Sequence, residues 1–368
     1  MAQGSIKKDR ALFLLFLFTV FFLFSCSRDE PIEVPRNMIL FIGDGMGEAQ
    51  VIAGSYFGTG IEEGLSFQQF PVRGRVTTFS ADNDITDSAA AATAMATGRK
   101  VNNGVLSVAI PGDGKPLETI LEQSMRRGKG GGVVTTTSST HATPAAFVSH
   151  QPSRIDVAAI AHDILYGSRP TLLFGGGGEG MNPVAAKGAG YTVVTDRLSM
   201  MNVNLQDLPV SGQFGESHMP YEYDGLGELP HLAEMTQKAL ELLSTNSMGF
   251  FLMVEGGRID HAAHQNDGER LVREVVEFDH AVQIAVTWAE EHKNTLILVT
   301  ADHETGDLEV IYPNGEGKVP VLHWGSTGHT GKRVPLYAWG TGAETFKGDQ
   351  DNTDIYRRLR WFLDQALP

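Results

Sequence analysis

Carboxylates, imidazoles and a hydroxyl recur directly after runs of apolar residues in this 368-residue sequence. One such side chain has an ordinary explanation, because an aspartate after a strand is most often a turn residue or a helix cap, and a lone histidine is usually only a surface residue. Their repetition in five separate segments indicates a functional site. The set comprises Asp44, Thr143, Glu255, Asp260, His264, Asp302, His303 and His329.

The chemistry that this set favours is metal binding. Asp260 and His264 are four residues apart, so a helix would place both on one face. Carboxylates that meet at one site repel one another strongly unless cations lie between them. Imidazole mixed with carboxylate suits zinc, and carboxylate with hydroxyl suits magnesium. Two zinc ions roughly 3.5–4 Å apart could hold the attacking and leaving oxygens of a displacement at phosphorus.

A single serine opens the alanine-rich stretch DITDSAAAATAMATGRK. The stretch predicts a helix over about 88–97, with Asp87 as its N-cap and Gly98 ending it. Ser88 would then lie among the free N–H groups of the first turn, which favour a phosphate dianion. A metal ion could convert its hydroxyl into an alkoxide nucleophile. Taken alone, the commoner explanation is that Ser88 merely follows a capping aspartate.

Strand and helix patterns alternate along the chain and predict an α/β fold with a mostly parallel, doubly wound central sheet covered by helices on both faces. Functional sites in such folds lie beyond the carboxyl ends of the strands. We expect one domain over 37–368, with an irregular excursion near 200–230 that is either a lid or a long loop. Strands are expected over 37–45, 131–139, 171–178, 249–257 and 294–303, and helices over 231–243 and 271–291.

The N-terminus has the pattern of a secretory signal over 1–25. A basic start precedes 14 mainly apolar residues from Ala11 to Phe24, which is short for a membrane span of ~20 residues, although an uncleaved anchor helix is the alternative. Cys26 is the only cysteine, and LFSC resembles a bacterial lipobox, which implies cleavage before Cys26, lipid on its thiol and a tether over 26–36. The sequence therefore predicts an exported protein anchored in the cell envelope, periplasmic or at the outer membrane.

The charge balance restricts the partners. The formal net charge is −15, and because the segment before Cys26 carries +2, the remainder carries about −17. Binding to a nucleic-acid backbone needs clustered Lys and Arg, so the sequence predicts no nucleic-acid surface. A small phosphate ester is not excluded, because it is recognised locally.

Six segments resemble, in chain order, the motifs of the alkaline phosphatases: ILFIGDGMG, TDSAAAATAMATG, THATPAAFVSHQPSR, VEGGRIDHAAHQ, TADHETG and GHTG. The resemblance spans roughly residues 37 to 340. It implies an alkaline-phosphatase-like fold and metal-dependent hydrolysis of phosphate monoesters through a phosphoserine, favoured at alkaline pH. It also implies two Zn²⁺ and one Mg²⁺. Members of the family commonly form homodimers, and the sequence leaves open whether this chain does.

The resemblance implies a role for each position. Ser88 would be the nucleophile, and Arg154 would clamp the phosphate with its planar guanidinium, oriented by Asp87. Asp260, His264 and His329 would hold the first zinc. Asp44, Asp302 and His303 would hold the second, beside Ser88. Asp44 would also bridge to a third position with Thr143 and Glu255, where the family commonly holds magnesium.

Two positions vary within the family. One branch has Asp and Lys where this chain has His141 and His261, and other members have His at both. The histidine pair removes a carboxylate and a fixed cation, so we expect the third metal to be held differently and its identity to stay open. Both histidines are expected to support the site without holding an ion.

Two other functions are consistent with part of this pattern. Phosphodiesterases and sulfatases of the same superfamily usually have Thr or a modifiable Cys as nucleophile, so Ser88 speaks against them. A lipid-anchored metal-binding module without catalysis would need to have lost Ser88 or Arg154, and the sequence keeps both.

Overall fold

The computed structural model describes Met1 and residues 33–365, and the expected signal segment, Cys26 and most of the expected tether lie outside these residues. Residues 33–365 belong to one compact unit. Among the described residues, no helix has both the length and the apolar character needed to cross a membrane.

The apolar runs form a ten-stranded sheet with the order β14-β2-β13-β8-β1-β7-β3-β4-β6-β5. Two short two-stranded sheets, β10-β11 and β9-β12, stand apart from it. The strands are β1 (Asn37–Gly43), β2 (Val72–Thr77), β3 (Gly130–Ser138), β4 (Leu172–Gly176), β5 (Thr192–Val194), β6 (Val210–Gln213), β7 (Phe250–Gly256), β8 (Thr295–Ala301), β9 (Glu304–Thr305), β10 (Leu308–Tyr312), β11 (Val321–Trp324), β12 (His329–Thr330), β13 (Val334–Gly340) and β14 (Gly348–Asp351).

The register at the centre of the sheet aligns the carboxyl ends of its strands. β1 is buried along its whole length and runs parallel to β7 and β8. Gly43, the last residue of β1, pairs with Gly256 on one side and with Ala301 on the other. Asp44 and Asp302, each the next residue in its chain segment, therefore leave the sheet at the same edge. β13 runs antiparallel to β8 and β2, so the sheet is mostly but not wholly parallel.

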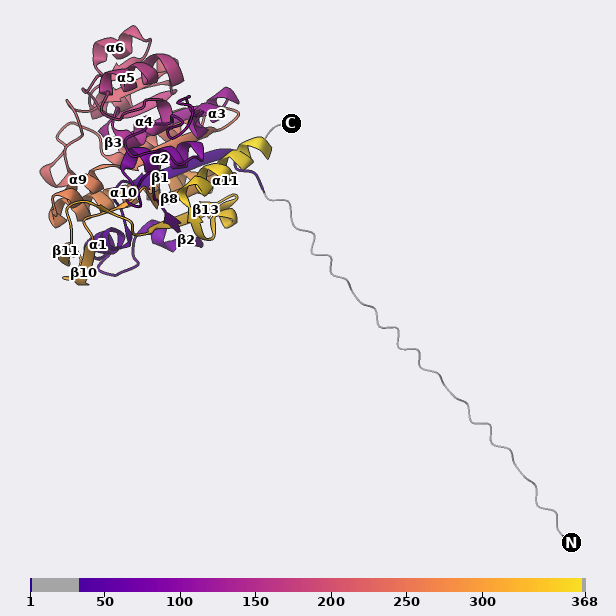
Figure 1. Cartoon of the computed structure of the whole chain (residues 1–368), viewed down its shortest axis with the longest axis vertical. Coiled ribbons are helices and arrows are strands. Elements are labelled where there is room, and N and C mark those ends of the chain that lie inside the picture. The colour runs from indigo at the N-terminus through magenta and orange to yellow at the C-terminus, as the bar shows by residue number, and fades with distance from the viewer. Residues whose placement is uncertain (2–32, 366–368) are drawn as a thin grey trace. The chain divides into compact units, whose positions relative to one another are not determined.

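Helices cover both faces of the sheet, as Figure 1 shows. The long α10 packs against α1 and α8, and α2 packs against α4 and α11. The helices are α1 (Glu48–Thr59), α2 (Ser88–Thr97), α3 (Ile120–Arg126), α4 (Ala142–Val148), α5 (Val157–His162), α6 (Pro183–Gly188), α7 (Arg197–Met201), α8 (Leu232–Leu243), α9 (Arg258–His264), α10 (Gly268–Glu291) and α11 (Asn352–Gln365), with single 3₁₀ turns η1 (Ser66–Gln69), η3 (Leu205–Asp207), η4 (Glu222–Asp224) and η5 (Ala343–Phe346) and a π turn η2 (Asp163–Ser168).

Side-chain size explains the packing of these layers. Phe278 of α10 meets Phe41 of β1 edge-to-face, with ring centroids 5.8 Å apart, which is a favourable aromatic geometry. On the other face α2 is buried from Ser88 to Ala96. Its alanines let neighbouring helices approach its backbone closely. The predicted α/β fold with a doubly wound sheet is thus confirmed.

One short strand lies within the segment 200–230, for which the sequence predicts an irregular excursion. The segment contains β6, which pairs in parallel with β4 and β5 inside the main sheet, and the single turns η3 and η4. The sequence VSGQ of β6 has only one large apolar residue and is four residues long, so its period-2 signal was too weak to read. The sheet therefore holds residues 210–213, whereas most of the segment lies in neither helix nor strand.

Candidate active site

The predicted ligands of the first metal ion meet at one point. Nε2 of His264 lies 3.1 Å from Nε2 of His329 and 3.3 Å from Oδ2 of Asp260. The other ring nitrogen of each histidine donates to a backbone carbonyl, Nδ1 of His264 to Thr327 at 2.6 Å and Nδ1 of His329 to Thr86 at 2.9 Å. Such bonds fix the tautomer that leaves Nε2 free for a metal ion. The converging donor atoms fit a small cation with imidazole and carboxylate ligands.

The predicted second position lies beside Ser88. Nε2 of His303 lies 3.2 Å from Oδ2 of Asp302, 3.4 Å from Oδ1 of Asp44 and 3.3 Å from Oγ of Ser88. Both of these carboxylate oxygens are buried and have no hydrogen-bond partner in the described part of the chain. A buried, unpaired carboxylate oxygen is costly, and a cation bound between the two would remove that cost.

Glycine makes the close approach of these segments feasible. Gly45, directly after Asp44, has φ +70°, a conformation that favours glycine. A Cβ at this position would lie 2.9 Å from Cα of Asp260. The Asp-Gly pair at the end of β1 is therefore needed for Asp44 and Asp260 to share one site.

The predicted third position gathers Glu255, Asp44 and Thr143. Oγ1 of Thr143 donates to Oδ2 of Asp44 at 3.4 Å. Oε2 of Glu255 accepts from Thr137 at 3.0 Å and from Thr135, while its Oε1 is buried without a hydrogen-bond partner within residues 33–365. His141 differs from expectation here: a ring nitrogen lies within 4.8 Å of carboxylate oxygens of both Asp44 and Glu255, so the structure places His141 with the candidate ligands.

Asp87 connects the helix that carries Ser88 to Arg154. Its Oδ1 accepts from the backbone N–H of Ala90 at 3.0 Å, which is an N-cap, and its Oδ2 accepts from Nη1 of Arg154 at 3.0 Å. Gly98 ends the helix with φ +72°, as the sequence predicted. Ser88 is 2% exposed and lies at the first position of the helix. A phosphate placed between Ser88 and Arg154 would face both the helix N-terminus and a guanidinium.

Burial and mutual repulsion dominate the electrostatics of the carboxyl groups. Burial, and next the charge of Asp302, raises the pKa of Asp44 well above its ordinary value. Burial raises the pKa of Asp302 to about 8 and that of Glu255 to about 7. For Asp260 burial acts in the same direction, but hydrogen bonding to His264 and the nearby imidazoles outweigh it, so its pKa is lowered. Bound cations would displace the protons that these groups otherwise retain.

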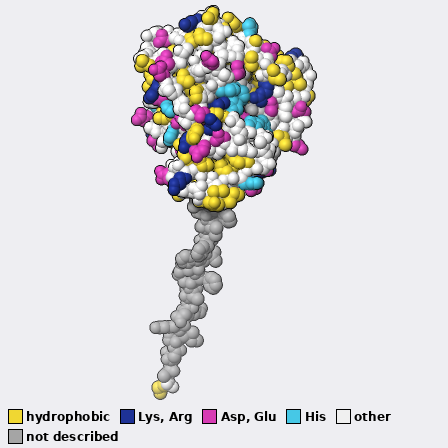
Figure 2. Space-filling model, turned by 90° about the vertical axis from the view of Figure 1, so that its left-hand side faces the viewer, with side chains coloured by type: hydrophobic (Ala, Val, Ile, Leu, Met, Phe, Trp, Pro, Cys, Tyr) yellow, Lys and Arg dark blue, Asp and Glu magenta, His cyan; other side chains and the backbone are white. Residues whose placement is uncertain are grey.

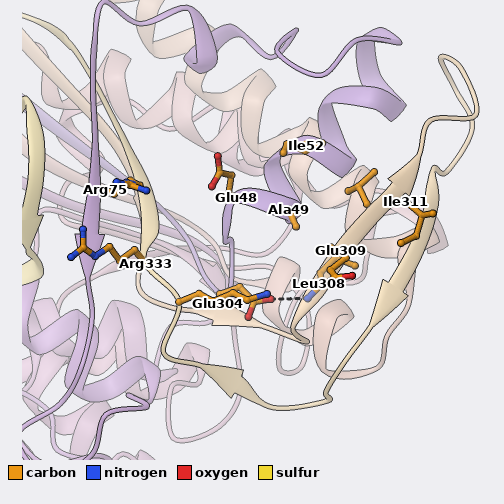
Figure 3. A pocket seen from close by; sticks show the side chains of 11 residues that line it. Glu48, Ala49, Ile52, Arg75, Glu304, Leu308, Glu309, Ile311 and Arg333 are labelled. Atoms are coloured by element: carbon orange, nitrogen blue, oxygen red, sulfur yellow. Dashed lines mark hydrogen bonds between the residues drawn. The ribbon is translucent and has the colours of Figure 1, made fainter.

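Glu304, the residue after His303, ties β9 to β12, the strand that carries His329. Its carboxylate accepts from Nε2 of Gln50 at 2.9 Å, from the N–H of Leu308 at 3.1 Å and from the hydroxyl of Thr330. Glu304 also lines a surface pocket of about 720 Å³ between α1 and β10, shown in Figure 3 with the bond to Leu308 as a dashed line. Because Thr330 follows His329, this one carboxylate fixes β9 and β12 behind the site.

Sequence reasoning missed two residues of this neighbourhood, His218 and Arg258. The imidazole of His218 packs edge-on against His141 and His261, with centroids 5.3 and 4.5 Å apart, and its Nδ1 accepts from the N–H of Ser138 at 3.0 Å. Nη1 of Arg258 donates to Nδ1 of His261 at 2.6 Å. Histidine side chains gather at the centre of one face of the molecule with basic side chains beside them (Figure 2). Arg258 lies within the VEGGRIDHAAHQ segment, whereas no pattern marks His218.

The three imidazoles beside the site are held neutral. Burial and the charge of Arg154 lower the pKa of His141 well below its ordinary value. Burial and the neighbouring His218 lower the pKa of His261 to about 3. Burial and Arg258 lower the pKa of His218 as well.

Comparisons with known proteins agree with this geometry. The family model described as alkaline phosphatase matches residues 35–187, 177–318 and 314–365. Alkaline phosphatase 3 of Bacillus subtilis is 32% identical over 88% of this chain and 88% of its own, and streptomycin-6-phosphate phosphatase of Streptomyces griseus is 34% identical over 87% and 89%.

A solved structure agrees as well. The alkaline phosphatase from the Antarctic bacterium TAB5 superposes with a TM-score of 0.81 at 30% identity, over 90% of this chain and 99% of that one. The fold, the converging ligands and these relatives lead to one conclusion: the chain belongs to the alkaline phosphatase family and is a metal-dependent enzyme that hydrolyses phosphate monoesters.

Proposed function

We propose that Ser88 is the nucleophile and that the reaction passes through a phosphoserine. The observation that supports this most directly is the position of its Oγ, which lies 3.3 Å from Nε2 of His303 at the first turn of α2. Bound there, metal ions would lower the pKa of the hydroxyl and neutralise charge on the leaving oxygen. Ser88 Oγ attacks phosphorus, the bond from phosphorus to the ester oxygen breaks, and the alcohol leaves.

Water then attacks the phosphorus of the phosphoserine. The bond between phosphorus and Ser88 Oγ breaks, which releases inorganic phosphate and restores the hydroxyl. Throughout both steps Arg154, braced by Asp87 at 3.0 Å, holds two phosphate oxygens. The free N–H groups of the first turn of α2 add positive potential on the same side.

We also infer the identity and position of the metal ions. Asp260, His264 and His329 hold one Zn²⁺, and Asp44, Asp302 and His303 hold a second. Asp44, Thr143 and Glu255 hold Mg²⁺ with His141 nearby, and the imidazole makes this third position less selective for Mg²⁺ than a carboxylate would. In support, a variant of the TAB5 enzyme with one histidine changed to aspartate has Mg bound in its M3 site.

Trapping the covalent intermediate tests this proposal. Wild-type enzyme mixed with a chromogenic phosphate monoester and quenched in acid should carry one phosphoryl group, located by peptide mass spectrometry on Ser88. Enzyme pretreated with a chelator should carry none and release no phosphate. If the enzyme turns over rapidly but the phosphoryl group is found on another residue, Ser88 is not the nucleophile.

We further propose that the mature chain is exported and anchored to the bacterial envelope by lipid on Cys26. The support is the basic and apolar N-terminal pattern followed by LFSC. Expressed in a bacterium as the full chain, the protein should partition into the detergent phase of a phase-separation assay. Cys26→Ala should shift it to the aqueous phase, whereas Ser27→Ala should not. Equal partitioning of Cys26→Ala and wild type would contradict lipid attachment.

A further inference from the structure

The loop that carries Arg154 connects α4 to α5 and is held from two sides. On one side it pairs with an earlier loop of the chain. Gln151 and Leu106 exchange two backbone hydrogen bonds of 2.9 Å, and the N–H of Arg154 donates to the carbonyl of Gly104 at 2.8 Å. These bonds fix the backbone position from which the guanidinium of Arg154 extends.

A single carboxylate oxygen holds the loop from the other side. Oδ2 of Asp163 accepts from the hydroxyl of Ser149 at 3.0 Å and from the N–H of His150 at 2.9 Å. It also accepts from Nε2 of Gln151 at 2.8 Å. Hydrogen bonds to an ionised acceptor are roughly twice as strong as those between neutral groups. Three consecutive residues of the loop, of which Ser149 is fully buried, therefore depend on Asp163.

A change of helix type brings Asp163 to this loop. Asp163 is the first residue of the π turn η2, which follows α5 directly. The turn packs against α4, and at its other end the hydroxyl of Ser168 donates to the carbonyl of Val148, the last residue of α4, at 2.7 Å. π turns next to α-helices are rare and occur frequently at functional sites. Here the turn ties the end of α4 and the residues after it to one element.

The earlier loop is in turn fixed to α2. The N–H of Ser107 donates to Oγ1 of Thr93 on α2 at 2.9 Å. Ser88 is the first residue of this helix, and its N-cap, Asp87, accepts from Nη1 of Arg154 at 3.0 Å. The spacing between Ser88 and Arg154 is therefore set at both ends of the arginine, by its guanidinium on Asp87 and by its backbone on the earlier loop.

We propose that Asp163 is a positioning residue of the phosphatase reaction: its carboxylate holds residues 149–151 and so keeps Arg154 ordered before phosphate arrives. The three groups that donate to Asp163 all belong to the loop, so it acts through Arg154 and not on the substrate. An ordered guanidinium loses little conformational entropy when phosphate binds, whereas a loop released from Asp163 has to be ordered by the phosphate itself. The inference rests on the proposed role of Arg154 in holding phosphate oxygens.

Kinetics and phosphate binding of Asp163→Ala test the proposal. The KM for a chromogenic phosphate monoester and the dissociation constant of inorganic phosphate should each rise about tenfold, because ordering a single backbone residue on binding costs about that factor. The value of kcat should change by no more than about threefold, because the bound phosphate then holds Arg154. Asp163→Asn, whose amide oxygen can accept the same bonds without the charge, should lie between wild type and Asp163→Ala.

A double-mutant cycle separates positioning from a general loss of stability. Arg154→Ala alone should raise the dissociation constant of inorganic phosphate about 10²-fold, since it removes two hydrogen bonds between charged groups. In the Arg154→Ala background, Asp163→Ala should change this constant by less than about twofold. If Asp163→Ala does not fold, Asp163→Asn takes its place in the cycle.

Asp279→Ala is the matched control. The carboxylate of Asp279 also accepts from a serine hydroxyl and from two backbone N–H groups, those of Ser66 and Phe67 in η1. The turn η1 precedes β2, which runs in the same direction as β8 because both are antiparallel to β13. The contact therefore lies toward the amino ends of the strands, at the edge opposite to the site, and the affinity for phosphate should not change.

Hydrogen exchange measured by mass spectrometry gives a readout that does not depend on activity. Peptides covering residues 148–156 should exchange faster in Asp163→Ala than in wild type, and inorganic phosphate should restore most of the protection, whereas peptides of α2 should not change.

Three results would overturn the proposal. The first is a folded Asp163→Ala that binds phosphate as tightly as wild type while Arg154→Ala does not, which leaves the proposed role of Arg154 standing. The second is an equally large effect of Asp163→Ala with and without Arg154, which would indicate a structural role only. The third is unchanged phosphate affinity in Arg154→Ala, which would remove the proposed role of Arg154 together with that of Asp163.

Discussion

Replacing Ser88 by alanine will lower kcat for a chromogenic phosphate monoester by roughly 10³-fold or more, the effect typical of removing a nucleophile. The reason is geometric, because the Ser88 hydroxyl is the buried oxygen at the N-terminus of α2 within 3.3 Å of His303. Its loss leaves the converging carboxylates and Arg154 in place. Inorganic phosphate should therefore still bind, and steady-state rates together with phosphate binding measure both effects.

Thr97→Ala is the matched control for this variant. Thr97 carries a hydroxyl at the opposite end of the same helix, where Oγ1 donates to the carbonyl of Thr93 at 2.8 Å. Its removal should change kcat by no more than about twofold, since most substitutions away from a site have small effects. Wild-type activity in a correctly folded Ser88→Ala would exclude Ser88 as the nucleophile and with it the phosphoserine.

The parts of the site that could be predicted from the sequence are those that follow directly from buried strands. The run before Asp44 and the run before Asp302 were each unambiguous, and parallel pairing of β1 with β8 brings their ends together without further information. Helix α2 was equally readable, because its cap, its alanines and Gly98 are local signals. The sequence alone can therefore reveal functional residues that lie at the end of a strand or in the first turn of a helix.

The rest depends on contacts between distant segments. His218 reaches His141 and His261 only because β6 joins the sheet beside β4. The four residues of β6 include one large apolar side chain, so the sequence shows no alternating pattern that would predict a strand there. His261 contacts Nη1 of Arg258, and His218 accepts from the N–H of Ser138, and no spacing rule connects these partners to the two histidines. His141 likewise could be placed beside Asp44 and Glu255 only when α4 was packed against the sheet.

Removing the metal ions will destabilise the protein, and the loss will be larger at pH 9 than at pH 6.5. In the metal-free chain the folded pKa of Asp302 is raised from 3.8 to about 8, that of Glu255 from 4.5 to about 7 and that of His264 from 6.5 to about 9. A group whose pKa is raised on folding contributes stability that is lost as pH rises through the folded value. Between pH 6.5 and 9 the folded metal-free chain binds more protons than the unfolded chain, so its free energy of unfolding falls.

The size of this fall in the free energy of unfolding follows from the shifted pKa values. The two buried carboxyl groups alone give a loss of roughly 2–3 kcal/mol over this range. The lowered pKa values of His141, His261 and His303 act in the opposite direction, but only below about pH 6.5, where unfolded imidazoles become protonated. In the loaded protein the ligands are already deprotonated, and metal affinity rises with pH. The difference in the free energy of unfolding between the metal-loaded and the metal-free protein must therefore grow toward alkaline pH.

Urea unfolding with and without chelator at pH 6.5, 7.5 and 9 measures this difference. Asp302→Asn should flatten the pH dependence of the metal-free form, because it removes one of the two buried carboxyl groups of the second metal position whose pKa is raised. Glu274→Gln is the control: burial raises the pKa of Glu274 to about 8 as well, but this residue of α10 accepts from the N–H of Glu222 and is not a candidate ligand, so it titrates in both forms. If the loss of the free energy of unfolding on adding chelator is constant with pH, or larger at pH 6.5, these carboxyl groups do not hold the ions.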